Sequence, residues 1–201
     1  MKEKLRNKRR DEILDIAVEV LAERGYRNAS MLQVARQASA SKETLYAWFN
    51  DKKGLFEEVI KRNAETVKTV LERHLESQST VKNILNEFGC ALLELLLSDN
   101  AVAINRAAIS EVKADPSLAI TLAKAGRDAT LPVFIKLLNQ LQSRGVLETM
   151  DSAQAAQDFL GLLIGDTQVR RLLDLEPAPS KAMIHARARH ATDMFLRLYS
   201  S

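Results

Sequence analysis

Residues 30–56 read SMLQVARQASASKETLYAWFNDKKGLF and constrain the fold more than any other part of the chain. Ser30 is placed to cap a short helix whose apolar positions predict a buried face: Met31, Val34, Ala35 and Ala38. The pattern breaks at the small residues 39–40. Ser41 is then placed to cap a second helix, 42–49. Two short helices joined by a tight turn form a helix-turn-helix, whose second helix fits the major groove of DNA.

An ordinary helical hairpin packed into a core is the alternative interpretation of these residues. Such a hairpin would not usually leave so many polar or small residues on one short helix with so few apolar anchors. The residues in question are Lys42, Glu43, Thr44, Tyr46 and Ala47. The pattern therefore favours DNA binding over simple core packing.

The run from Thr44 to Phe56, with Leu45-Tyr46, Trp48-Phe49, Lys52 and Leu55 inside it, resembles the signature of the TetR family of bacterial transcriptional repressors. The resemblance covers about residues 8 to 60. Two positions depart from the family pattern: Ser39 stands where the turn usually has glycine, and Glu43 replaces a commonly small residue. Ser39 must therefore tolerate the backbone conformation of the turn at modest cost. Glu43 is expected to alter base preference.

The resemblance and the helix geometry together predict which residues contact DNA. Lys42, Thr44 and Ala47 are expected to face the groove, while Leu45 and Phe49 belong to the core. Phosphate contacts are expected from Ser30, Tyr46, Trp48 and Lys52, the last beside the amides that begin the next helix. The full predicted DNA-binding set is Ser30, Ser41, Lys42, Glu43, Thr44, Tyr46, Ala47, Trp48 and Lys52.

Charge is distributed unevenly along the chain, although the net charge is only +3. Residues 1–53 hold 12 Lys and Arg against 8 Asp and Glu, whereas the remainder holds 17 against 18. The basic tail, with Lys2, Lys4, Arg6, Lys8, Arg9 and Arg10, is either a solvated terminus or a phosphate or minor-groove contact. Its position beside the helix-turn-helix favours contact with DNA.

Apolar residues recur at helical spacing along the whole chain, and no alternating run predicts a strand. We expect an all-α protein of about ten helices, with a ninth from Asp151 to about Leu173 and a tenth from Ser180 to about Leu198. No apolar run approaches the roughly 20 residues that span a bilayer, and no signal peptide is visible. The single cysteine, Cys90, fits a reducing compartment, so we expect a cytoplasmic protein without membrane contact.

Two domains are expected: a three-helix DNA-binding domain at 1–50 and a larger helical domain at 51–201. In the TetR family the second domain binds a small ligand and forms the dimer, and its sequence here further resembles the AefR-like type. Polar residues within apolar helices, and aromatic or aliphatic residues beside them, are the candidates for ligand contact. These are Phe88, Leu92, Asn105, Arg106, Phe134, Phe159 and Asp166. Each of them is alternatively an ordinary core or surface residue.

The last two long helices are candidates for a homodimer interface, since a four-helix bundle across a two-fold axis would bury both apolar stripes. The predicted interface residues are Phe159, Leu162, Val169, Ile184, Ala188, Ala191, Phe195 and Leu198. For each stripe alone, an intramolecular core is the competing interpretation. Cys90 is similarly open between a small buried hydrophobe, which we favour, and a thiol sensor.

The chain has no residue pattern typical of catalysis. His185 and His190 are five apart, which does not place both on one helical face for a metal, and no phosphate-binding glycine loop or CxxC pair occurs. We therefore expect no enzyme activity, cofactor or metal. The expected function is a dimeric repressor that binds a palindromic DNA operator and is released by a small-molecule inducer. An activator, or a helical protein-interaction module without a DNA role, remains the alternative.

Overall fold

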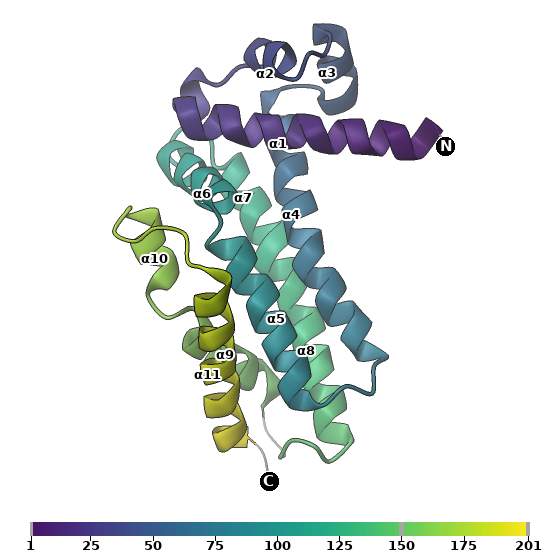
Figure 1. Cartoon of the computed structure of the whole chain (residues 1–201), viewed down its shortest axis with the longest axis vertical. Coiled ribbons are helices and arrows are strands. Elements are labelled where there is room, and N and C mark those ends of the chain that lie inside the picture. The colour runs from purple at the N-terminus through teal and green to yellow at the C-terminus, as the bar shows by residue number, and fades with distance from the viewer. Residues whose placement is uncertain (1, 149–150, 200–201) are drawn as a thin grey trace. The chain divides into compact units, whose positions relative to one another are not determined.

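The computed structural model describes residues 2–148 and 151–199, with the backbone alone for residues 2 and 3. These residues form helices joined by short loops, with no strand among them, which confirms the all-α class (Figure 1). No helix in the described ranges is both long and apolar enough to cross a membrane. A π-helical segment, η1 (Ala123–Arg127), joins α7 to α8. In chain order the helices are α1 (Lys2–Asn28), α2 (Met31–Gln37), α3 (Lys42–Phe49), α4 (Lys52–Leu75), α5 (Val81–Leu96), α6 (Asp99–Glu111), α7 (Ser117–Leu122), α8 (Asp128–Ser143), α9 (Ser152–Ile164), α10 (Thr167–Leu172) and α11 (Lys181–Tyr199).

The chain packs as two compact units. The N-terminal unit comprises Met1–Arg62 and Asp99–Lys124, and the C-terminal unit comprises Asn63–Ser98 and Ala125–Ser201. Helix α6 belongs to the N-terminal unit because it packs along α1, and Arg27 Nε on α1 pairs with Glu111 Oε1 on α6 at 2.9 Å. The predicted domain boundary at residue 50 stays a prediction of where the DNA-reading region ends.

Three connections of the chain pass between the two units. The first lies within α4, the second at the link between α5 and α6, and the third within η1. A π-helical turn accommodates one more residue per turn than an α-helix and is often found at functional sites. Residues beside each of these three connections recur in the ligand cavity described below.

Side-chain caps begin the helices where the sequence predicts them. Ser30 and Gln33 form a capping box at α2, and Ser41 Oγ accepts the backbone N–H of Thr44 at 3.0 Å in α3. Asp51 Oδ1 accepts the backbone N–H of Gly54 at 2.7 Å, which orders the first turn of α4. Such caps satisfy amides that have no partner inside the helix, and each contributes about 1 kcal/mol.

The predicted ninth helix is wrong as a single element, because it is broken at Gly165. Helix α9 ends at Ile164 and α10 begins at Thr167, with Gly165 at φ 50° and ψ −129° between them. Residues with a side chain rarely adopt this conformation. A Cβ at residue 165 would also lie 2.6 Å from Nη2 of Arg187, whose guanidinium donates to the carbonyls of Leu163 and Ile164.

A cluster of phenylalanines forms the centre of the C-terminal unit. Phe88 lies 4.5 Å from Phe134 and 5.9 Å from Phe159 between ring centroids, and Phe195 meets Phe159 edge-on at 5.5 Å. All four side chains are fully buried. Aromatic pairs in such tilted and edge-to-face arrangements add about 0.5–1.5 kcal/mol beyond the burial of their area. The cluster joins α5, α8, α9 and α11 into one core.

Candidate DNA-reading surface and ligand cavity

Helix α3 has a buried face and an exposed face, as the sequence predicts. Leu45 and Phe49 are 0% and 3% exposed and anchor the helix to the N-terminal unit. Lys42, Glu43 and Ala47 are exposed on the other side, as is Tyr46, with Thr44 half-exposed beside them. The Lys42 ammonium lies 5.6 Å from the centroid of the Tyr46 ring, so a cation and a phenol share this surface. Ser30 and Ser41 are also exposed, and their hydroxyls serve as the helix caps.

Glu43 places a negative charge at the start of this helix. Hydrogen bonds from its own backbone N–H and from the Ser41 hydroxyl lower the pKa of the Glu43 carboxyl, so it is ionised at neutral pH. A carboxylate repels phosphate, and it can accept a hydrogen bond from cytosine N4 in the major groove. The charge is therefore suited to base discrimination rather than to general affinity.

In the turn between α2 and α3, a serine adopts the left-handed backbone conformation. Ser39 has φ 49°, and Ala40 N–H donates to Ala35 O at 2.9 Å while Ser39 N–H donates to Arg36 O at 3.1 Å. This pair of bonds is a Schellman motif, in which glycine is the usual left-handed residue. The Arg9 guanidinium donates to the carbonyls of Ala38 and Ser39 from α1 and so satisfies acceptors that the turn leaves open.

Arginines of the basic tail lie against the helix-turn-helix. Arg6 lies over the half-buried Trp48 ring, 5.8 Å from its centroid, and Arg10 lies 5.3 Å from that of Phe49. Arg10 also pairs with Glu58 at 2.9 Å. These contacts hold part of the tail's positive charge beside α3; the side chain of Lys2 lies outside the described residues. The tail's contact with DNA stays a prediction.

The half-buried Lys52 side chain bonds to the end of α1. Its ammonium donates to the Tyr26 carbonyl at 2.7 Å and lies 4.3 Å from the centroid of the Tyr26 ring. Burial is the main cause that lowers the pKa of Lys52, and nearby Glu111 opposes the shift. The amine therefore joins the start of α4 to the end of α1, and its contact with a phosphate stays a prediction.

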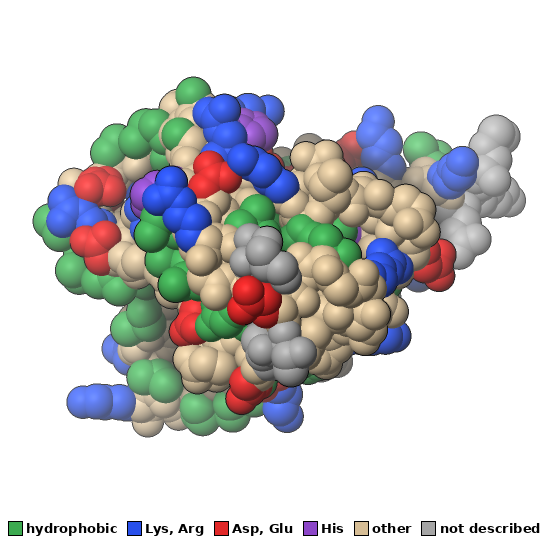
Figure 2. Space-filling view, turned by 90° about the horizontal axis from the view of Figure 1, so that it is seen from below, with side chains coloured by type: hydrophobic (Ala, Val, Ile, Leu, Met, Phe, Trp, Pro, Cys, Tyr) green, Lys and Arg blue, Asp and Glu red, His purple; other side chains and the backbone are tan. Residues whose placement is uncertain are grey.

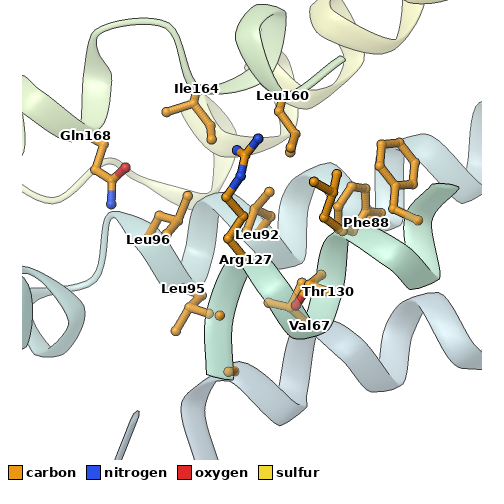
Figure 3. A pocket seen from close by; sticks show the side chains of 14 residues that line it. Val67, Phe88, Leu92, Leu95, Leu96, Arg127, Thr130, Leu160, Ile164 and Gln168 are labelled. Carbon is orange, nitrogen blue, oxygen red and sulfur yellow. The ribbon is translucent and has the colours of Figure 1, made fainter. Parts of the chain in front are cut away.

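A cavity of about 250 Å³ lies in the C-terminal unit. Its walls are mostly aliphatic and aromatic, and they come from α4, α5, η1, α8, α9 and α10. The predicted ligand residues Phe88, Leu92 and Phe134 line it together. The polar lining consists of Gln168 and of Arg127 and Thr130, the last two of which sequence reasoning missed (Figure 3). Gly126, beside Arg127, lies in the π-helical segment, a feature that no periodicity in the sequence indicates.

Four other predicted ligand residues do not line this cavity. Asn105 and Arg106 lie on α6 in the N-terminal unit, where the Asn105 amide donates to Ala101 O within the helix. Phe159 is fully buried in the phenylalanine cluster. Asp166 follows the break after α9 and lines a second cavity, of about 630 Å³. None of these four side chains lines the first cavity: Asn105 and Arg106 lie in the other unit, Phe159 is buried in the core, and Asp166 follows the break after α9.

The second cavity lies between α10, the loop that follows it and α11. Arg171 is 5% exposed and donates to the carbonyl oxygens of Leu97 and Glu176, which ties the loop to the end of α5. Arg170 forms an ion pair with Glu176 at 2.5 Å. Through these bonds, Arg170, Arg171 and Glu176 stabilise the loop after α10.

The expected dimer residues fall into two groups. Phe159, Ile184, Ala188, Ala191 and Phe195 are buried within the chain and therefore pack its core instead of a partner, which corrects that part of the prediction. Leu162 is half-buried, and Val169 and Leu198 are exposed. The outer faces of α9 and α11 also expose small residues, with Gly161 on α9 and Ala182 and Ala186 on α11.

Cys90 is half-buried, and its Sγ lies 3.2 Å from Nδ1 of His185. Burial is the main cause that raises the pKa of the Cys90 thiol, with a further contribution from Glu94. A thiol with a raised pKa is mostly protonated at neutral pH and reacts slowly with oxidants. The environment therefore favours the structural interpretation of this residue. No group of three or more potential metal ligands occurs in the described part of the chain.

Figure 2 shows one face of the chain from below, on which the described Lys and Arg side chains are interspersed with Asp and Glu among hydrophobic side chains.

Comparison with known proteins agrees with these features. Residues 13–59 match the family of bacterial regulatory proteins of the tetR type, and residues 83–201 match the C-terminal domain of AefR-like transcriptional repressors. The HTH-type transcriptional repressor BepR of Brucella suis is 27% identical over 160 residues, which cover 78% of this chain and 77% of BepR.

Solved structures share the fold over almost the whole chain. A TetR transcriptional regulator from Agrobacterium tumefaciens is 30% identical, with a TM-score of 0.73 and coverage of 96% of this chain and 95% of that one. A TetR-family structure from Mesorhizobium loti, 24% identical, has a TM-score of 0.79 and coverage of 97% and 98%. The two family matches, the similar proteins and the helix-turn-helix of α2 and α3 lead to one conclusion: the chain belongs to the TetR family of DNA-binding transcriptional regulators, with a C-terminal domain of the AefR-like type.

Proposed function

We propose that this regulator is a repressor that binds a palindromic operator as a homodimer, in the bacterial cytoplasm, and leaves it when a small molecule occupies the 250 Å³ cavity. The DNA-binding part of this proposal rests on one observation: helix α3 has one buried face and one exposed face. Leu45 and Phe49 hold the helix from one side, and the opposite side presents Lys42, Thr44, Tyr46 and Ala47 without an apolar neighbour to cover them. The relative BepR is named as a repressor, which supports the direction of regulation.

Each exposed side chain of α3 has a defined role in this proposal. Lys42 donates to a guanine, and the Ala47 methyl contacts a thymine methyl, so these two residues discriminate between bases. Tyr46, Ser30 and Trp48 contact phosphates and fix the position of the helix without reading sequence. Arg6 and Arg9 add positive charge beside the groove, which increases affinity for all sequences.

Dimerisation is proposed through the outer faces of α9 and α11. Gly161, Ala182 and Ala186 are small and exposed, so a partner helix could approach closely there. Exposed apolar residues at Val169, Met183 and Leu198 would be covered in the same assembly. A two-fold axis would present two α3 helices to successive major grooves, and the gain in avidity compensates for the small contact area of each helix.

The position of the cavity along the chain supports control of DNA binding by a ligand. Beside each of the three points where the chain passes from one unit to the other, there are residues that line the cavity. Ala64 and Val67 follow the crossing in α4, Leu95 and Leu96 precede the one after α5, and Gly126 and Arg127 follow the one in η1. A ligand that moves these walls acts directly on the segments that lead to the N-terminal unit.

Selection of bound fragments from a random double-stranded DNA library, followed by mobility-shift titration, tests the proposal. We expect a palindromic consensus and a complex that contains two chains. Double substitution of Lys42 and Tyr46 by Ala should abolish the shift while circular dichroism keeps the helical signal. As a matched control, Lys136→Ala, at an exposed position of α8, should bind like the wild type. Failure to enrich any sequence at moderate salt would overturn the DNA-reading role of α3.

A further inference from the structure

The cavity in the C-terminal unit combines apolar walls with one cation. Eleven of its lining residues are Ala, Val, Leu, Ile, Phe or Gly, and none is Asp or Glu. Arg127 is the lining residue that carries a full positive charge. In the described ranges 2–148 and 151–199, this guanidinium has no ion pair and no hydrogen bond. A ligand that fills the cavity would therefore meet a cation whose charge the protein does not neutralise.

The direction of Arg127 makes this charge part of the cavity. Figure 3 shows its side chain rising from the start of α8 toward the gap between Leu160 and Ile164 of α9, with the guanidinium among apolar side chains. Arg127 is exposed, so its guanidinium is accessible to solvent. When an apolar compound displaces that solvent, the charge loses solvation, and an unpaired charge removed from water is unfavourable. A neutral ligand would bear this cost, whereas an anion at the guanidinium would remove it.

Two neutral polar groups lie on the same walls. Thr130 lies in the first turn of α8, three residues after Arg127, which ends η1. Gln168 extends from α10 on another wall. A hydroxyl and an amide can each donate to a carboxylate oxygen, while the planar guanidinium can bind both oxygens of a carboxylate at once. Each of these groups can therefore donate to a polar group of a ligand in the cavity, and only the guanidinium also neutralises a negative charge.

We propose that the ligand of this cavity is an amphipathic carboxylic acid, with its carboxylate on Arg127 and a mainly aliphatic body against Val67, Leu92 and Leu95. This inference rests on the proposed function of the cavity as the inducer site. A volume of about 250 Å³ is just below the range of roughly 300–1,000 Å³ typical of ligand sites, so the body is of medium length. The aliphatic walls match an alkyl chain, with Phe88 at its apolar end (Figure 3) and the Phe134 ring 4.5 Å from that of Phe88 between centroids.

Calorimetric titration of the full-length protein with hexanoate, octanoate and decanoate, each below its micellar concentration, tests the proposal. The primary alcohols of equal length are the matched neutral probes. We expect at least one acid to bind at least tenfold more tightly than its alcohol. Arg127→Gln should lower the affinity for that acid at least tenfold and leave the affinity for the alcohol within about twofold, whereas Arg127→Lys should keep part of the preference. Because Arg127 has no bond within the described chain, these variants should keep the wild-type melting temperature.

Arg144→Gln is the matched control, since this arginine ends the same helix and contacts the carbonyl of Ser77 outside the cavity. It should bind the acids like the wild type. Equal affinity of acids and alcohols, or absence of binding by every acid of the series, would overturn the inference, as would an Arg127→Gln variant with unchanged affinity for the acids. Operator binding is measured in the same preparations. A protein that binds operator and is released by neutral compounds alone would refute the carboxylate and keep the regulator, while one that binds no DNA would refute the proposed function.

Discussion

The Arg9 guanidinium donates to the backbone carbonyl of Ser39 at 3.3 Å, and Ser39 holds that carbonyl in place with a left-handed φ of 49°. The turn between α2 and α3 thus combines a strained serine with an arginine that caps its free acceptors. A residue with a Cβ loses about 1–2 kcal/mol in the left-handed region, whereas glycine does not.

Ser39→Gly should therefore stabilise the protein. Relief of the left-handed strain exceeds the added flexibility of glycine in the unfolded chain, and we expect a net gain of about 0.5–1 kcal/mol in the free energy of unfolding. Urea denaturation measures the change. Ala40→Gly is the matched control because residue 40 does not have a positive φ, and it should lower stability by about 0.4–1 kcal/mol. Loss of stability in Ser39→Gly would contradict the strain at this turn.

Lys42 and Tyr46 should have separable effects on DNA binding, although the Lys42 ammonium lies only 5.6 Å from the centroid of the Tyr46 ring. Lys42→Ala should relax the preference at one base pair by about 1–3 kcal/mol, since it removes a base contact. Tyr46→Phe should weaken binding to all sequences about equally, since a phosphate contact carries no sequence information. Quantitative selection on a library of single-base operator variants measures both effects. A uniform loss in Lys42→Ala, without a change of preference, would mean that α3 lies in the groove in another orientation.

Gly161→Arg should separate the dimer without unfolding the chain. No atom outside the local backbone lies within 4 Å of a Cβ at this position, so an arginine fits on one chain. In a dimer that pairs the outer faces of α9, the same side chain would enter the interface and carry an unpaired charge into it. Sedimentation equilibrium should give about twice 22.4 kDa for the wild type and 22.4 kDa for the variant.

Two further variants make the dimer prediction specific. Asn139→Arg, on the exposed side of α8, should remain dimeric. Phe195→Glu should lose helical signal, because Phe195 is fully buried in the phenylalanine cluster and a charge there has no partner. A monomeric wild type at micromolar concentration, or a dimeric Gly161→Arg, would refute the α9 and α11 interface.

The sequence predicts the helices of this protein well where local signals specify them. The caps at Ser30 and Ser41 and the apolar spacing on α2 and α3 depend on residues a few positions apart, so they can be recognised without knowledge of the fold. The break at Gly165 is different. A glycine inside an apolar run is compatible with a helix. The end of α9 is stabilised instead by the guanidinium of Arg187 on α11, which donates to the carbonyl of Ile164 and is distant in the sequence.

Side-chain roles were predictable only where one helix determines them. Leu45 and Phe49 were assigned to the core correctly because a short amphipathic helix has one apolar face. The stripe on α11 was ambiguous, since an apolar face packs equally well against the chain's own helices or a partner's, and here α5 and α9 cover it. Arg127 was missed because its position depends on η1, whose π-helical hydrogen bonds shift the register of the residues around the cavity.

The hydrogen bond between Tyr199 and Asp158 should make part of the stability depend on pH. Donation by the Tyr199 hydroxyl, and then by the Gln154 amide, lowers the pKa of the Asp158 carboxyl below its ordinary 3.8. A carboxyl whose pKa is lower in the folded state contributes stability above its unfolded pKa and loses it as the pH falls through the folded pKa.

Tyr199→Phe should consequently lower the melting temperature at pH 5 to 8, and the difference from the wild type should shrink as the pH falls below about 4. The ring contact with Phe195, 4.8 Å between centroids, is retained in this variant. Calorimetric melting between pH 3 and 8 measures the difference. Tyr46→Phe, at an exposed ring without a hydrogen-bonded carboxylate in the described chain, should show no such pH dependence. A difference that stays constant to pH 3 would contradict the role of Asp158.

Coupling between the cavity and the operator should be reciprocal. Helix α4 runs without interruption from Lys52 to Leu75 and lines the cavity with Ala64 and Val67, so a ligand that displaces it acts on the N-terminal unit of each chain. The two α3 helices must meet grooves about 34 Å apart or a multiple of that distance, and a change in their separation penalises both half-sites.

We expect a coupling of about 1–3 kcal/mol between ligand binding and operator binding, which weakens DNA binding some 5- to 150-fold. By linkage, the ligand must bind the operator complex more weakly than the free protein by the same factor. Calorimetric titration of any cavity ligand with and without operator measures both affinities, and Ala64→Phe, which fills the cavity, should bind operator without responding to the ligand. Equal affinities in the two titrations would rule out this mechanism for that compound.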